Sequence, residues 1–132
     1  MNFRMLVPTI ALFAFSASAN ATVEIWNWAV VTKDADNLIA GYGASIFQIE
    51  GAKRSGPLHL QGNISGKLNF TIDGVHVRGT LTPENYHSKS IEMEGEITRE
   101  KTSGEFQCLE TVRMTNGIHY VVLDRAPKTC ES

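Results

Sequence analysis

The clearest regularity in this chain is an alternation of apolar and polar residues that changes phase once, between residues 62 and 83. The apolar residues lie on even numbers before the change and on odd numbers after it: Ile64, Leu68, Phe70 and Ile72, then Val75, Val77 and Leu81. Successive residues of a strand point to opposite faces, so each half predicts a strand with one buried face. The change coincides with Asp73-Gly74, a dipeptide typical of tight hairpin turns.

This segment therefore predicts a β-hairpin whose apolar sides share one face of a sheet. If Asp73 and Gly74 form a two-residue turn, the register follows. The expected pairs are Ile72 with Val75, Phe70 with Val77, Leu68 with Gly79, and Gly66 with Leu81. Each glycine then lies opposite a leucine, which leaves room for the larger side chain or for a bend of the sheet.

Further β-branched, aromatic or alternating segments predict strands along the rest of the chain. They are residues 22–31, 45–50, 58–61, 90–100, 104–114 and 118–123. Asn116-Gly117, between the last two segments, is a second strong hairpin signal. We predict an all-β fold, a single small antiparallel barrel or sandwich of about seven to eight strands, without separating these two architectures.

The first 21 residues have the pattern of a secretory signal peptide. Arg4 precedes an apolar run from Met5 to Phe15, and small residues follow it. Cleavage is expected after Ala19 or Ala21, with residues 22–132 forming one β domain in the periplasm or outside the cell. The apolar run is too short for a spanning helix, and no later segment predicts one.

Charge excludes one class of partner. The chain has 12 basic and 14 acidic residues and a formal net charge of −2. Nucleic-acid binding needs a clustered basic face that neutralises phosphates, so we expect no nucleic acid partner. The pair Lys53-Arg54 precedes Ser-Gly-Pro and is interpreted as part of a solvated turn.

The only two cysteines, Cys108 and Cys130, are separated by 22 positions. This spacing fits no metal-binding or redox C-x-x-C motif, and exported chains keep their disulfides. We therefore predict a structural disulfide. Closing a loop of this length stabilises a domain by about 3 kcal/mol on the chain-entropy model.

Catalytic chemistry has no support in the sequence. Four histidines are scattered one per predicted element, without H-x-H or H-E-x-x-H spacing, so no metal is expected. Neither a nucleophile elbow nor a phosphate-binding loop is present. We expect a non-catalytic protein that needs no cofactor.

The first candidate binding feature is an acidic row. Glu92, Glu94 and Glu96 alternate with apolar residues, so their side chains project from one face of a strand. One interpretation is an acidic stripe that docks a basic protein partner. The other is a solvated face whose charge is offset by the preceding strand: if Leu81 pairs with Ile91, Arg78 lies opposite Glu94 and His76 opposite Glu96.

Two further features are ambiguous between packing and binding. Trp26 and Trp28 share one face of a strand whose other face is also apolar; one face is either exposed to a ligand such as a glycan or covered by residues 41–47. Glu110 shares the parity of apolar neighbours. A bulge or a strand-end exit turns it outward, or it lines a cavity as a ligand contact.

Two N-x-[ST] sequons, at Asn63 and Asn69, are glycan acceptors only under eukaryotic export. The leading functional hypothesis is an exported, non-catalytic binding protein that recognises or inhibits another protein through a sheet face. Two alternatives remain: a carrier of a small apolar or sugar ligand in a barrel cavity, and an envelope structural or assembly factor.

Overall fold

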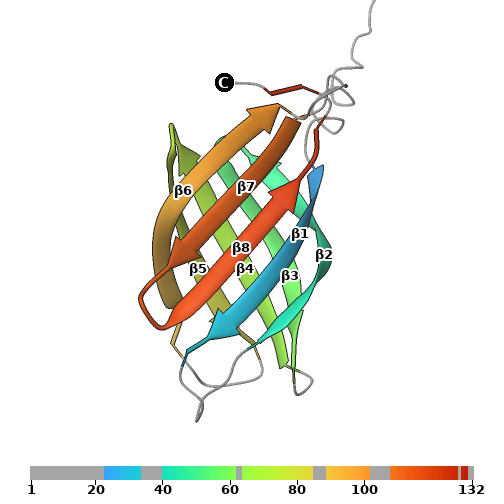
Figure 1. Cartoon of the computed structure of the whole chain (residues 1–132). Coiled ribbons are helices and arrows are strands. Elements are labelled where there is room, and N and C mark those ends of the chain that lie inside the picture. Colours follow the sequence, from blue (N-terminus) through green and yellow to red (C-terminus); the bar gives the residue numbers. More distant parts are fainter. Residues whose placement is uncertain are drawn as a thin grey trace, which may run out of the picture.

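The chain folds into one closed antiparallel barrel of eight strands joined in sequence order, as the computed structural model shows (Figure 1). The structure describes residues 23–33, 40–61, 64–84, 89–101, 108–127 and 129–130. The strands are β1 (Val23–Thr32), β2 (Gly41–Glu50), β3 (Lys53–Leu60), β4 (Ile64–Asp73), β5 (His76–Pro83), β6 (Ile91–Lys101), β7 (Cys108–Thr115) and β8 (His119–Arg125). The all-β prediction is confirmed, and the architecture is the barrel.

Alternation along every strand fills the inside of the barrel with apolar side chains. Its aromatic centre consists of Trp26, Phe47 and Phe70. The centroid of the Phe70 ring lies 5.5 Å from that of Trp26 and 5.6 Å from that of Phe47. Leucines, valines and methionines from the other strands surround these rings and are also buried. Burial of this apolar surface is the main force that stabilises the fold.

The predicted β4–β5 hairpin exists, but its predicted register is wrong. Asp73 pairs with His76, so the turn residues are Gly74 and Val75, and Ile72 lies opposite Val77. The remaining pairs shift by two residues: Phe70 faces Gly79, Leu68 faces Leu81 and Gly66 faces Pro83. Because the shift is even, Leu68, Phe70, Val77 and Leu81 still point inward as predicted, whereas Val75, expected on the same face, is exposed in the turn.

The conformation of Gly74 is compatible with the observed turn. Its φ is +66°, and glycine reaches positive φ without steric strain. In two-residue hairpin loops of type II′ glycine occupies the first central position, whereas Asp-Gly predicts it at the second. The β2–β3 hairpin repeats this arrangement, with Gly51 at φ +64° followed by Ala52.

The interpretation of Lys53-Arg54 as a solvated turn is wrong. Both residues begin β3, which continues through Gly56-Pro57. A Cβ atom on Gly56 would lie 2.8 Å from the ring of Phe47, so this glycine makes room for the aromatic core instead of breaking the strand. Arg54 faces inward and is mostly buried.

The predicted disulfide is confirmed between Cys108, the first residue of β7, and Cys130. The Cys108 amide also donates a hydrogen bond to the Pro127 carbonyl at 2.9 Å. These two links hold the segment after β8 against the barrel. The predicted signal peptide lies outside the described residues. Within the described residues, no helix is long and apolar enough to span a membrane.

Replacing Gly74 with valine should lower the free energy of unfolding by about 1 to 3 kcal/mol, because a β-branched residue is strained at positive φ. Thermal unfolding followed by circular dichroism measures this loss. Val75→Thr, in the same turn, should change stability by less than about 0.5 kcal/mol. Equal melting temperatures for Gly74→Val and the wild type would contradict the turn assignment.

Candidate functional site

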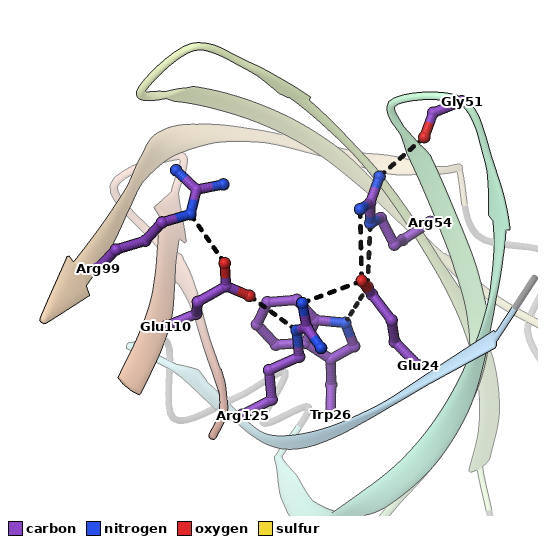
Figure 2. A network of polar contacts seen from close by, with 7 residues as sticks. All are labelled: Glu24, Trp26, Gly51, Arg54, Arg99, Glu110 and Arg125. Atoms are coloured by element: carbon purple, nitrogen blue, oxygen red, sulfur yellow. Dashed lines mark hydrogen bonds and ion pairs between the residues drawn. The ribbon is translucent and has the colours of Figure 1, made fainter. Parts of the chain in front are cut away.

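Five charged side chains form a layer inside one end of the barrel, above the aromatic centre (Figure 2). We call this set the charged layer; its members are Glu24 on β1, Arg54 on β3, Arg99 on β6, Glu110 on β7 and Arg125 on β8. Each has the parity of the buried residues on its strand. The layer lies at the end of the barrel where β1 begins and β8 ends.

The ion pairs of the charged layer form one continuous chain. Glu24 accepts hydrogen bonds from Nε and Nη2 of Arg54 at 3.1 and 3.4 Å. It also forms an ion pair with Nη2 of Arg125 at 3.2 Å. Glu110 then accepts from Nε of Arg125 at 2.7 Å and from Nε of Arg99 at 2.8 Å. Five strands are thereby linked through side chains as well as through backbone hydrogen bonds.

The charged layer is also fastened to the core beneath it. The indole Nε1 of Trp26 donates to Glu24 Oε1 at 2.9 Å, and the Arg125 guanidinium lies 5.3 Å from the centre of the Trp26 ring. These contacts give the buried indole N–H a partner and add a cation–π interaction. Trp26 therefore joins the charged layer to the aromatic centre of the barrel.

Glu110 shows how the charged layer was partly foreseen. The bulge or strand-end exit expected for this residue is wrong: Cys108, Glu110, Val112 and Met114 all point inward without a change of phase. The carboxylate is buried because two guanidinium groups meet it. Glu24, Arg54, Arg99 and Arg125 were not identified from the sequence, although all four share the parity of core residues.

The other strong candidate is a groove of about 660 Å³ on the outer surface over β3 to β7. We call it the polar groove. One row of residues in register crosses it, and these are Lys53, Thr71, Arg78, Glu94 and Thr115. A parallel row contains Asn69, Thr80 and Glu92. Cations lie on the β3–β5 side and carboxylates on β6.

The acidic row has the cross-strand neighbours that the sequence predicted. Leu81 pairs with Ile91, so that Arg78 lies opposite Glu94 and His76 opposite Glu96. On the other side Glu96 lies opposite Arg113 of β7. All three glutamates are exposed, and Glu92 and Glu94 line the polar groove whereas Glu96 lies beyond it.

Trp26 and Trp28 point into the core and are almost completely buried. The indole Nε1 of Trp28 donates to the Ser45 hydroxyl at 2.9 Å. Residues 41–47 belong to β2, which pairs edge to edge with β1, so they do not cover the opposite face of β1, and in the described part of the chain that face is exposed. Asn69 is half-buried at the groove, where its Oδ1 accepts a hydrogen bond from Ser55, and Asn63 is outside the described residues.

Among the described residues, no group of three histidine, cysteine or carboxylate side chains is arranged to hold a metal ion. Comparison with protein-family models, with curated proteins and with solved structures finds no match to this chain.

Replacing Glu110 with glutamine should lower the free energy of unfolding by about 1 to 3 kcal/mol, because two guanidinium groups lose their shared carboxylate. The value lies below that of a fully buried pair, since Arg99 and Arg125 are each about one quarter exposed. Denaturant unfolding measures it. The matched control is Glu100→Gln, exposed on β6, for which less than about 0.5 kcal/mol is expected. Equal effects of the two variants would refute a stabilising role for the charged layer.

Proposed function

We propose that this protein is an exported, non-catalytic binding protein whose polar groove recognises another protein. The observation that carries the proposal is the groove itself: a hollow of about 660 Å³ on the outer face of a barrel, lined mainly by hydroxyl, amide and charged side chains. Such side chains supply hydrogen-bond donors and acceptors for a polypeptide. Their strands are fixed on both sides by the closed sheet, so little conformational entropy is lost on binding.

The charge distribution of the groove favours a partner with cationic side chains. Glu92 and Glu94 lie on one strand and face the same way, about two residue rises or roughly 7 Å apart. The facing wall carries Lys53 and Arg78. A partner segment with basic residues next to β6 and an acidic or neutral residue next to β3 would complement both walls. Complementarity of this kind raises the association rate and excludes wrong partners more than it raises affinity.

A carrier function is less well supported. A carrier needs an internal cavity, but in the described part of the chain all eight strands contribute buried side chains to the barrel interior, the large rings of Trp26, Phe47 and Phe70 among them. An eight-stranded barrel has an interior that such side chains fill. The groove and not the interior is therefore the proposed binding site.

The test begins with the capture of a partner from the extracellular or periplasmic fraction on immobilised wild-type protein. The captured partner is purified, and its association rate with each variant is then measured. The double variant Glu92→Gln/Glu94→Gln should bind several-fold more slowly than the wild type at low ionic strength. At about 1 M salt, where the Debye length is near 3 Å, the difference should largely disappear.

The control is Glu50→Gln/Glu100→Gln, which removes the same two charges from exposed positions outside the groove. It should associate at nearly the wild-type rate. If both double variants are slowed equally, net charge and not the groove steers the encounter. If neither is slowed, the glutamates have no part in recognition.

A further inference from the structure

Glu94 of β6 lies where three hollows of the outer surface meet. Besides the polar groove, it borders a hollow of about 560 Å³ over β4 to β6 and another of about 410 Å³ over β6 to β8. We call the last one the tyrosine hollow; its outward side chains include Glu94 and Glu96 on β6, Arg113 and Thr115 on β7, and Tyr120 on β8. The polar groove and the tyrosine hollow share Glu94 and Thr115, so they adjoin at these two residues.

The tyrosine hollow carries an excess of negative charge. Its charged residues are two carboxylates, Glu94 and Glu96, and one guanidinium, Arg113. Glu96 lies directly opposite Arg113, whereas the residue opposite Glu94 on β7 is the uncharged Thr115. The charge of Glu94 is therefore not offset on the β7 side, and the hollow attracts a single cation there.

The other side of Glu94 is less favourable to a cation. There Glu94 lies opposite Arg78 of β5, but the two side chains form no ion pair, and neither does Glu94 with any other residue in the described part of the chain. A cation that approaches from the polar groove is repelled by Arg78. One that approaches over Thr115 reaches the same carboxylate from the side remote from Arg78.

An aromatic ring borders the position over Thr115. This threonine pairs with Glu94 on one side and with Tyr120 on the other, so the three residues form one row across the sheet. At a strand spacing near 4.8 Å, Glu94 and Tyr120 belong to strands about 10 Å apart, with the short threonine side chain between them. A cation in that interval can pair with the carboxylate and contact the ring. Arginine suits both contacts, because its planar guanidinium pairs with carboxylates and stacks on aromatic faces.

Hydrogen bonds of the β7–β8 turn hold this row in place. The Thr115 hydroxyl donates to the His119 carbonyl at 2.8 Å and accepts from the Gly117 amide at 2.9 Å. Oδ1 of Asn116 accepts from the His119 amide at 2.8 Å, and the Tyr120 hydroxyl donates to the Gly117 carbonyl at 3.4 Å. The threonine and the tyrosine are thus positioned without a ligand, so that little conformational entropy is lost when one binds.

We propose that the row of Glu94, Thr115 and Tyr120 is a subsite for one arginine side chain of the protein partner. The inference rests on the proposed function, in which the partner segment next to β6 carries the basic residues. It adds that one of these residues is an arginine, whose guanidinium lies over Thr115 in the tyrosine hollow. A lysine would gain the ion pair with Glu94 but would stack less well on the ring, so it would bind more weakly.

The test is an NMR titration of the folded, disulfide-bonded chain with the tripeptide acetyl-Gly-Arg-Gly-amide at low ionic strength. The backbone amide shifts of Glu94, Thr115 and Tyr120 should change, with a dissociation constant on the order of 10 mM for so small a ligand. The same peptide with citrulline, the uncharged isostere of arginine, should leave these shifts unchanged. Equal responses to the two peptides would overturn the proposal.

Two variants test the row itself. Glu94→Gln and Tyr120→Leu should each weaken binding of the arginine peptide by about three-fold, whereas Tyr120→Phe, which keeps the ring, should bind as the wild type does. The matched controls are Glu100→Gln on β6 and Tyr42→Leu on β2, both at exposed positions outside the tyrosine hollow, and neither should change the affinity. Circular dichroism checks that each variant is folded. If Tyr120→Leu binds the peptide as tightly as Tyr42→Leu does, the subsite is refuted.

The titration needs no captured partner, so its result is independent of the association-rate experiment. Suppose that Glu92→Gln/Glu94→Gln slows association of the captured partner and that Tyr120→Leu leaves its affinity unchanged. The arginine subsite is then wrong, and the polar groove keeps its proposed role. If the peptide binds as expected but the double variant does not slow the partner, the proposed function fails while the row still binds arginine.

Discussion

Pairing of the first strand with the last is the interaction on which the rest of this structure depends. β1 is hydrogen-bonded to β2 on one side and to β8 on the other, and this second pairing converts a twisted sheet into a closed barrel. Closure removes the unpaired edges of the sheet and divides every strand into an inner and an outer set of residues. The ion pair between Glu24 and Arg125 lies across the same seam, so side chains strengthen it. The core, the charged layer and the polar groove follow from this division.

Period-two alternation was sufficient to predict the all-β fold, most of the inward face of the β4–β5 hairpin and the pairing of β5 with β6. It was insufficient where turn chemistry decides between neighbouring possibilities. Asp73-Gly74 and Gly74-Val75 both place glycine in a two-residue turn, and only the pairing of Asp73 with His76 in the folded chain selects the second. Gly56-Pro57 has the composition of a turn, yet it continues β3 because the Phe47 ring occupies the space beside the glycine. Such contacts join segments that local sequence does not relate.

The charged layer illustrates the same limit at the level of the site. Arg54, Arg99 and Arg125 each have the parity of buried residues, but a charge near a strand end is equally compatible with exposure to water. Glu110 lies between apolar neighbours of the same parity, a pattern that is equally compatible with a bulge that turns the carboxylate outward. These charged side chains come together because of the stagger of the strands around the barrel. The stagger brings the beginnings of β1, β3 and β7 to the same level as the ends of β6 and β8. The polar groove has the same origin, since its cross-strand rows exist only once five strands are in register.

The seam between β1 and β8 also has a consequence for the order of folding. Asn27 pairs with Asp124, so the contacts that close the barrel join positions 97 residues apart. The hairpins between successive strands can form as the chain is synthesised, because their loops are short. Closure has to wait until the C-terminal strand has left the ribosome, and until then the hydrogen-bonding groups on the outer edge of β1 have no partner. The barrel is therefore vulnerable to edge-to-edge association with other chains during synthesis and loses that vulnerability when its last strand is seated.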